Sequence, residues 1–276
     1  MPSLNSAALV DYHMHSNLSP DAFDRPEELA QAALGKGLVE IGICEHLDTD
    51  PKDAGYERYD EAAVDQALAL ARTASQGQLR IRKGVEVCYQ PCFEETARRL
   101  LAKHNQMDYV IGSVHFIDSQ VTNGAYMEAN GRQETYRRYM GDTLRLIRSG
   151  LFDIVGHFEY IRRYDAENGI HYHPEEYGDE ISAVLKEIIA QDMTLEVNTS
   201  GLRRPGRHTY PCQWTLERFR ELGGQAVAVG SDAHHTEHVG AGVGRVLAML
   251  QEMGFLYVVT FRGRHRRWVN IDKYVM

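Results

Sequence analysis

Histidine and acidic residues follow most of the short apolar runs in this chain. The positions at the ends of these runs are His13, His15, His46, Glu86, His115, His157, Asp232 and His234. Imidazole nitrogens and carboxylate oxygens together are typical ligands of Zn, Mn, Fe and Co. If the runs are parallel strands of an α/β barrel, the side chains at their C-terminal ends converge on one face. The pattern therefore predicts a multinuclear metal site of the kind that hydrolases use.

The spacing of the ligands supports this prediction. His13 and His15 are two residues apart on an expected strand, so both rings point to one face and can reach one ion. Asp232 and His234 repeat that spacing near the other end of the chain. Glu86 stands inside an apolar stretch, where a carboxylate is rarely buried unless it is paired or binds a metal. Its two oxygens could bridge two ions, and we expect two to three divalent ions per chain.

Some candidates are weak when each is taken alone. Asp21 lies in a Ser-Pro-Asp turn and would otherwise be an ordinary turn residue. His115 and His157 would each more often be structural histidines, and only the joint pattern makes them ligands. We interpret the other histidines as surface residues, of which His235 and His238 are near enough to reach the edge of the site. These other histidines are His104, His171, His173, His208, His235, His238 and His265.

Three arginines are candidates for contacts with a substrate. Arg162 and Arg163 follow the fifth apolar run, and Arg203 follows the sixth. The forked guanidinium group suits phosphate oxygens, although each arginine alone is as readily an ordinary surface residue. Asn198 and Ser200 could donate hydrogen bonds near the same place.

Apolar runs and helical patterns alternate along the whole chain. The runs lie near 8–13, 40–45, 79–87, 108–116, 152–158, 194–198 and 226–231. Helical spacing of apolar residues marks 27–38, 61–73, 94–104, 134–147, 175–189, 215–222 and 241–253. Seven strands alternating with seven helices favour a parallel α/β barrel over a doubly wound sheet, which would gather ligands at one switch point. We expect one domain over 1–276, with 256–271 as an extra edge segment and the arginine-rich run 262–267 on a solvated surface.

Composition narrows the classes of function. With 43% hydrophobic and 25% charged residues, the chain can bury a sizeable core. A net charge of −9 disfavours binding along a nucleic-acid backbone. No apolar run reaches the roughly 20 residues that span a bilayer, and no signal peptide is visible. The four cysteines, Cys44, Cys88, Cys92 and Cys212, are interpreted as buried free thiols. These features fit a cytoplasmic protein without a membrane partner, and they leave the oligomeric state open.

The ordered motifs resemble those of the PHP (polymerase and histidinol phosphatase) superfamily, and most closely its histidinol-phosphate phosphatases. The matching segments are His13-Met-His15 with Asp21, Glu45-His46, Gly84-Val-Glu86-Val, Gly112-Ser-Val-His115-Phe, Asp153-Ile-Val-Gly-His157-Phe, Glu196-Val-Asn-Thr-Ser-Gly-Leu-Arg203 and Gly230-Ser-Asp232-Ala-His234. The resemblance implies a distorted (β/α)7 barrel that holds three metals. It assigns His13, His15, Glu86 and Asp232 to the first ligand group. It assigns Glu86, His115 and His157 to the second ligand group, and Asp21, His46 and His234 to the third.

The resemblance also implies an activity. The expected enzyme is a metal-dependent phosphomonoesterase that hydrolyses L-histidinol phosphate in histidine biosynthesis. Arginines in the segments of Arg162, Arg163 and Arg203 would contact the phosphate. Arg162 and Arg203 would stabilise charge on its oxygens, while Asp232 or His234 would hand a proton to the leaving oxygen.

One segment departs from the family pattern, and other functions stay open. After Asp118 the chain reads Ser119 to Glu128 where the phosphatases usually have a loop with Gly and Trp. A different small phosphate ester is therefore an alternative substrate. An amidohydrolase is a second alternative, but its usual carboxylated lysine has no counterpart between Lys103 and Lys186. A metal-binding protein without activity is a third, although none of the nine ligand positions is broken.

Overall fold

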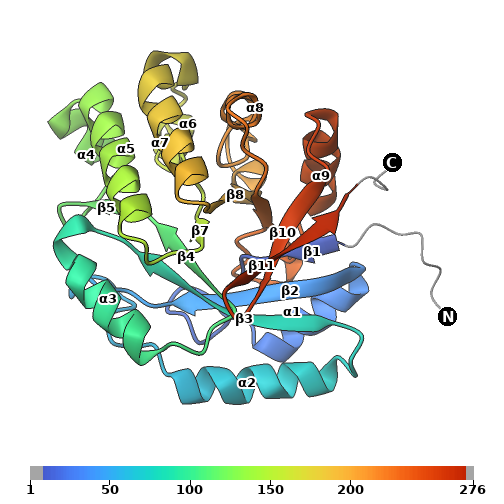
Figure 1. Ribbon diagram of the computed structural model, residues 1–276. Coiled ribbons are helices and arrows are strands. Elements are labelled where there is room, and N and C mark those ends of the chain that lie inside the picture. Colours follow the sequence, from blue (N-terminus) through green and yellow to red (C-terminus); the bar gives the residue numbers. More distant parts are fainter. Residues whose placement is uncertain (1–8, 272–276) are drawn as a thin grey trace.

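Seven parallel strands form a nearly closed barrel in the computed structural model, which describes residues 9–271 (Figure 1). In spatial order they are β1 (Leu9–Asp11), β2 (Leu38–His46), β3 (Arg80–Cys88), β4 (Tyr109–Ser113), β7 (Ile154–Val155), β8 (Thr194–Asn198) and β9 (Val227–Gly230). The two outer strands approach each other, because the amide of Tyr12 donates to the carbonyl of Val229 at 2.8 Å. A parallel bridge between Met14 and Ala233 continues this contact. The predicted single-domain α/β barrel is confirmed.

Helices cover the outside of the barrel, with α1, α2 and α3 on one side and α5, α7, α8 and α9 on the other (Figure 1). Their bounds are α1 (Pro26–Gly35), α2 (Glu61–Ala74), α3 (Glu94–Lys103), α5 (Arg132–Arg148), α7 (Gly178–Ala190), α8 (Gln213–Glu221) and α9 (Val243–Glu252). These match the seven predicted helical stretches to within a few residues. Capping explains some of the starts: Pro26 is the first residue of α1, and the Asp60 carboxylate accepts from two amides of α2.

Two connections carry short elements that the apolar pattern did not predict. Between β4 and α5 lie a small hairpin of β5 (Phe116–Ile117) and β6 (Gln120–Val121), and then α4 (Gly124–Asn130). The connection after β7 holds the short helix α6 (Arg162–Glu167). Both connections start at the C-terminal ends of strands, so both rise beside the predicted site.

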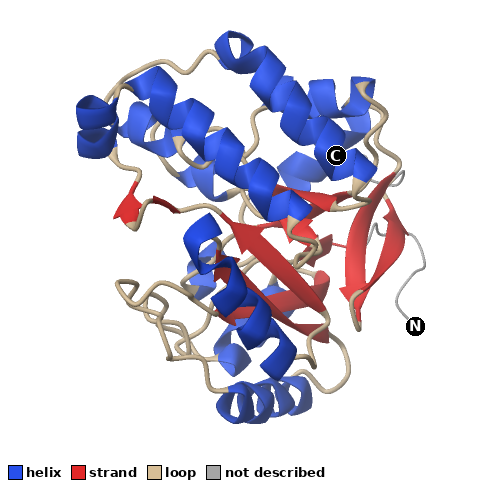
Figure 2. Ribbon diagram, turned by 60° about the vertical axis from the view of Figure 1, so that its left-hand side comes forward, coloured by secondary structure: helices blue, strands red, loops and turns tan. Residues whose placement is uncertain are grey.

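The C-terminal segment is a separate hairpin, so its prediction as an edge segment is wrong (Figure 2). Strands β10 (Tyr257–Arg262) and β11 (His265–Asn270) pair with each other and with no barrel strand. The hairpin lies against the N-terminal ends of the barrel strands, where Arg264 pairs with Asp153 at 2.7 Å and Arg266 pairs with Asp192. The arginine-rich run thus contains two anchoring ion pairs rather than only solvated charge.

Packing contradicts two predictions about exposure. His104 is buried, with Nδ1 3.0 Å from a carboxylate oxygen of Glu61, so it is not a surface histidine. Cys92 is exposed, whereas Cys44, Cys88 and Cys212 are buried free thiols as predicted. Cys92 lies in the short helical turn Pro91–Phe93 before α3, none of whose residues is buried.

Candidate metal centre

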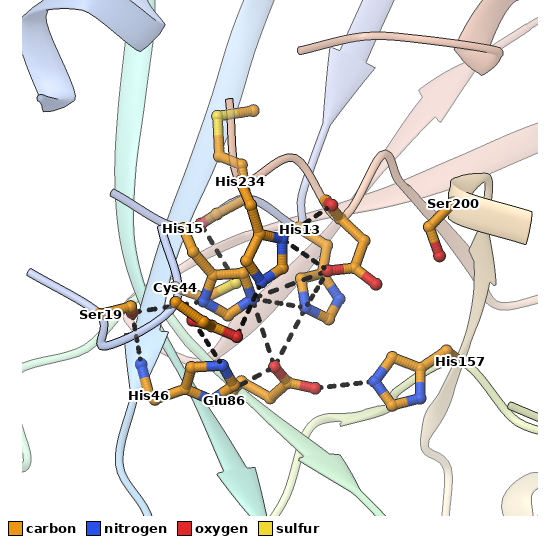
Figure 3. Close-up of polar contacts among 12 residues, drawn as sticks. His13, His15, Ser19, Cys44, His46, Glu86, His157, Ser200 and His234 are labelled. Carbon is orange, nitrogen blue, oxygen red and sulfur yellow. Dashed lines mark hydrogen bonds and ion pairs between the residues drawn. The ribbon is translucent and has the colours of Figure 1, made fainter. Parts of the chain in front are cut away.

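The first ligand group lies at the centre of the site, at the ends of β1, β3 and β9 (Figure 3). The Nε2 atoms of His13 and His15 are 3.1 Å apart, and each is 3.3 Å from Oε2 of Glu86. Oδ1 of Asp232 is 3.8 Å and 3.9 Å from the same two nitrogens. Ligand atoms around a tetrahedral zinc ion lie about 3.4 Å from one another. These four side chains are therefore spaced to hold one ion.

The second ligand group uses the other oxygen of Glu86. Oε1 of Glu86 is 2.9 Å from Nε2 of His157 and 3.8 Å from Nε2 of His115, and the two nitrogens are 3.1 Å apart. The same oxygen, Oε1 of Glu86, also accepts a hydrogen bond from the hydroxyl of Ser113 at 2.5 Å. Each carboxylate oxygen of Glu86 thus faces a different ligand group, as a carboxylate that bridges two ions requires.

The third ligand group is more open to solvent. Oδ1 of Asp21 is 3.5 Å from Nε2 of His46, and Oδ2 of Asp21 is 3.2 Å from Nε2 of His234. The side chain of Asp21 is 53% exposed and that of His234 is 28% exposed, whereas His13 and His15 are fully buried. His15 also lies within reach of His46 and His234, so it connects the first and third groups.

The charges of these groups fit divalent ions. Among residues 9–271, Asp21, Glu86 and Asp232 form ion pairs only with histidines. Burial lowers the pKa of His15 to about 3, with a further contribution from His46. An imidazole that is neutral near pH 7 has a free electron pair for a metal. Glu86 and Asp232 lie among imidazoles and pair with no lysine or arginine in residues 9–271, so they form a donor set that a cation would complete.

Cys44 lies beside His13 and His15, within reach of the same ion by distance alone. Burial raises the pKa of its thiol far above the ordinary range, and Sγ points toward the carbonyl of Met14 at 3.6 Å. A metal binds the thiolate rather than the thiol. Cys44 is therefore better placed as a packing residue than as a ligand.

Buried polar residues behind the ligands hold them in position. Glu196 on β8 accepts from Nδ1 of His13 at 2.7 Å and from the backbone amide of His157 at 2.6 Å. Glu45 accepts from the hydroxyls of Ser16 and Ser19, each at 2.5 Å. Carboxylates that bond the second nitrogen of a metal-binding histidine fix its tautomer and ring orientation. The residue pattern did not assign these roles, although Glu196 stands in an apolar strand just as Glu86 does.

The backbone is strained at two of the ligands. His157 has a φ of 20° and Asp232 has a φ of 54°, which non-glycine residues rarely adopt. Between β9 and β1, a Cβ added at Gly230 would collide with the side chains of His13 and Glu196. Strained backbone such as that at His157 and Asp232 clusters at functional sites, where the surrounding structure holds it.

A cavity of about 670 Å³ lies above the ligands and carries arginines on one wall. Arg163, Arg203 and Arg204 line it, as do the predicted edge residues His235 and His238. Nη2 of Arg203 donates to the carbonyl of Ser231 at 2.8 Å, while its buried Nη1 has no hydrogen-bond partner within residues 9–271.

Arg162 does not line the cavity. Its side chain is 4% exposed and stacks on the rings of Tyr172 and Tyr210, 3.7 Å from the carboxylate of Glu159. It begins α6, so its neighbour Arg163 leaves the helix in a different direction. The third arginine on the cavity wall is therefore Arg204, and not Arg162 as the sequence suggested. Ser200 also lines the cavity, and Asn198 donates to Asp232 at 3.4 Å.

Comparisons with known proteins connect this site to one family. A family model described as "PHP domain" matches residues 11–200. The protein from Deinococcus radiodurans named "Probable histidinol-phosphatase" is 30% identical over 93% of this chain and 97% of its own. "Histidinol-phosphatase" from Lactococcus lactis is 24% identical over 96% of both chains.

A solved structure extends the likeness to three dimensions. The crystal structure of histidinol phosphate phosphatase from Lactococcus lactis, complexed with Zn, L-histidinol and phosphate, has a TM-score of 0.83 at 22% identity. The similarity covers 95% of this chain and all of that one, and it shows a common fold. Within residues 9–271, no helix is long and apolar enough to cross a membrane.

Proposed function

This chain belongs to the PHP domain family, and we propose that it is a metal-dependent phosphomonoesterase with L-histidinol phosphate as its leading substrate. The observation that carries the proposal is the complete ligand set beneath an arginine-lined cavity. Nine histidine and carboxylate side chains meet at its floor, from the ends of β1, β2, β3, β4, β7 and β9 and from the turn at Asp21, and Arg163, Arg203 and Arg204 stand on one wall. That combination suits a doubly charged phosphate monoester.

The three ligand groups are the proposed places for two to three divalent ions. When bound, such ions neutralise phosphate charge and lower the pKa of water, which supplies the nucleophile. The chain's own residues do the rest. Glu86 holds the first and second groups together, and Glu196 fixes the ring of His13. Arg203 lines the cavity and is the proposed partner of a phosphate oxygen, with Arg163 and Arg204 adding positive charge.

Two side chains are the proposed proton donors to the leaving oxygen. Asp232 and His234 both line the cavity, and Nδ1 of His234 lies 3.6 Å from Oδ1 of Asp232. Asp21 bonds the other ring nitrogen of His234. His234 is the more exposed of the two and is therefore better placed to reach a departing alcohol.

Support for L-histidinol phosphate comes from the relatives, whose names specify histidinol phosphate and one of which binds L-histidinol and phosphate. The segment that departs from the family pattern also reaches this part of the site. Phe116 and Val121, on either strand of the β5–β6 hairpin, line the cavity. We propose that this hairpin helps to shape the pocket of the leaving group.

Initial rates with a panel of phosphate esters test the proposal. The wild-type protein, loaded separately with Zn and Mn, is assayed on L-histidinol phosphate, p-nitrophenyl phosphate, other small monoesters, a phosphodiester and an amide. We expect monoesters to react and histidinol phosphate to have the highest kcat/KM. A tenfold preference for another monoester would remove the histidine-biosynthesis role. Reaction with only the diester or the amide would overturn the phosphatase proposal. No lysine lines the cavity among the described residues, which disfavours the amidohydrolase alternative.

A further inference from the structure

We propose that Glu159 is a positioning residue for the arginine wall of the cavity, which consists of Arg163, Arg203 and Arg204. This inference rests on the proposed phosphatase function, because it concerns how that wall holds a phosphate group. Among residues 9–271, Glu159 is not part of the cavity lining, so it does not touch a bound substrate. It acts by fixing the relative position of arginines that two different connections supply.

The arginine wall comes from the connections after β7 and β8. Arg163 lies in α6, whereas Arg203 ends the helical turn Ser200–Arg203 and Arg204 follows it. On the outside of the wall, Glu167 pairs with Arg163 at 2.8 Å and with Arg204 at 3.5 Å. The side chain of Glu167 is 35% exposed, so solvent screens these ion pairs. They fix the distance between the two connections only weakly.

Glu159 makes a buried link between the same connections. Its side chain is fully buried in the connection after β7. Oε2 accepts from the backbone amide of Cys212 at 2.7 Å, and Oε1 accepts from the hydroxyls of Thr215 at 2.8 Å and Tyr172 at 2.9 Å. Cys212 and Thr215 lie at the start of α8, at the far end of the connection after β8. One carboxylate therefore joins both connections that carry the wall.

Arg162 carries this link to the wall on the β7 side. Its Nη1 lies 3.7 Å from Oε2 of Glu159, and its guanidinium group stacks on the rings of Tyr172 and Tyr210, at 5.2 Å and 6.0 Å from their centres. Arg162 directly precedes Arg163 in α6. The buried position of the first arginine therefore sets the start of the helix that presents the second.

Tyr210 carries the link to the wall on the β8 side. It exchanges two backbone hydrogen bonds with Asn198 at the end of β8, at 2.8 Å and 2.9 Å. A Cβ added at Gly201 would collide with the ring of Tyr210 and the carbonyl of His208, so the two segments are in close contact there. Gly201 lies in the same helical turn as Arg203. The position of that arginine therefore depends on the packing of Tyr210.

Stability alone does not explain a carboxylate in this place. Removing the charges of Glu159 and Arg162 from water costs free energy that their attraction offsets only with close geometry, and these atoms are 3.7 Å apart. Glu159 also has a φ of 70°, which non-glycine residues rarely adopt. Buried charge and backbone strain persist where the surrounding structure must hold one geometry. Here that geometry is the position of the wall.

Phosphate affinity is the measurement that tests this inference. The inhibition constant of inorganic phosphate, the KM for p-nitrophenyl phosphate and the metal content are compared between wild type and Glu159→Gln. The amide keeps the volume of the side chain, but it removes the charge beside Arg162 and places a donor where the carboxylate had an acceptor. We expect both constants to rise by about 10- to 100-fold, since a displacement of about 1 Å can cost about 100-fold. Metal content should not change.

Two milder variants carry the same test if Glu159→Gln does not fold. Tyr172→Phe and Thr215→Val keep the carboxylate and remove one donor each, so each should raise both constants by about 2- to 10-fold. Glu40→Gln is the matched control. Glu40 is also a buried carboxylate that accepts from a tyrosine and pairs with arginine, but it lies at the opposite end of the barrel, so both constants should stay at their wild-type values.

Removal of the arginines distinguishes positioning from a general defect. In a protein that already carries Arg163→Ala and Arg203→Ala, the addition of Glu159→Gln should change KM by less than about twofold, because Glu159 acts through those arginines. An undiminished rise in KM in this background would overturn the inference. So would a loss of metal that accompanies the rise, because Glu159 would then act on the ligand His157.

A structural role has a different kinetic signature. A fall in kcat with wild-type values of KM and of the inhibition constant would show a smaller fraction of folded enzyme, and it would overturn the inference while the proposed function stands. A wild-type protein that neither hydrolyses phosphate monoesters nor is inhibited by phosphate would instead remove the proposed function, and the inference with it.

Discussion

The two ends of the barrel both bury charged groups, but they compensate the charge differently. At the N-terminal end of β2, Glu40 accepts from Tyr12 at 2.5 Å, from Arg80 at 2.6 Å and from Arg82 at 2.8 Å. At the C-terminal end of β3, Glu86 meets imidazoles, and no arginine or lysine within residues 9–271 pairs with it. One carboxylate is neutralised by arginines of the chain, while the other pairs with histidines and is the proposed partner of an external cation.

The protonation states differ in the same way. Burial would raise the pKa of Glu40, but Arg82, Tyr12 and Arg80 together hold it below the ordinary range. Around Glu86, the pKa values of the histidines shift in opposite directions. Burial lowers the pKa of His115 to about 3, whereas Asp21 and Asp48 raise the pKa of buried His46 to about 10. Without metal, some protons must therefore occupy the cluster. Binding of metal ions would release them, which couples metal affinity to pH.

Removal of metal should have the largest effect, and it should affect one end of the barrel only. We expect elemental analysis to find two to three ions per chain at pH 7.5, with the third ligand group losing its ion first because Asp21 and His234 are the most exposed ligands. A chelator should reduce turnover to background and leave far-UV circular dichroism unchanged, because the Glu40 end needs no metal. Occupancy should also fall below about pH 6, as imidazoles take up protons. Less than one ion per chain after reconstitution would contradict this expectation.

The substitution Glu86→Gln should reduce kcat by at least ~10³-fold. The loss of one charge disturbs two ligand groups at once, because each oxygen of Glu86 faces a different group. Steady-state kinetics with metal analysis is the measurement, and Glu40→Gln is the matched control at the other end, with turnover near wild type. A folded Glu86→Gln protein with full metal content and normal turnover would show that Glu86 is merely structural.

The fold could be predicted because it depends on regular patterns. Each strand is a short apolar run, each covering helix has apolar residues at three- and four-residue spacing, and every predicted ligand except Asp21 stands where a strand ends. The structure brings the nine predicted ligands together for the same reason. Their role in binding metal stays a prediction until it is measured.

Contacts made by irregular segments could not be predicted in this way. Arg162 and Arg163 are adjacent in sequence, but α6 turns the first beneath Tyr172 and the second toward the cavity. The C-terminal hairpin likewise depends on distant partners such as Asp153, which pairs with Arg264.

A smaller effect on activity is expected from Arg203→Ala. Arg203 lines the cavity and is a proposed phosphate contact, so kcat/KM should fall by the factor that corresponds to about 1.5–3 kcal/mol of lost transition-state stabilisation. Arg203 also donates to the carbonyl of Ser231, so metal analysis should accompany the kinetics. Arg267→Ala, on an exposed position of the hairpin at the opposite end, should change nothing. Equal kinetics for the two variants would exclude Arg203 from phosphate binding.

The smallest expected effect is on stability, and it concerns Glu40 at the N-terminal end of the barrel strands. Glu40→Gln should lower the free energy of unfolding at pH 7 by about 1.5–2 kcal/mol, near the lower part of the range for charged hydrogen bonds, because Arg80 is largely exposed and its pairing is screened. Urea unfolding of the metal-free protein measures it without interference from the ligand groups. Arg80→Ala should cost less than Glu40→Gln, since Arg82 and Tyr12 still satisfy the carboxylate.

The difference in unfolding free energy between wild type and Glu40→Gln should depend on pH, because the pKa of Glu40 is lowered in the folded state. Below its folded pKa, Glu40 is protonated in both the folded and the unfolded chain, and its ionic contribution is absent. Above the ordinary pKa of 4.5 the carboxylate is ionised in both states, and the folded state gains the full contribution. The difference between wild type and Glu40→Gln should therefore be constant from about pH 5.5 to 8 and shrink as the pH falls below about 4.5. A difference that grows toward acid pH would mean that the arginines do not stabilise the ionised form, and the contrast between the two ends of the barrel would fail.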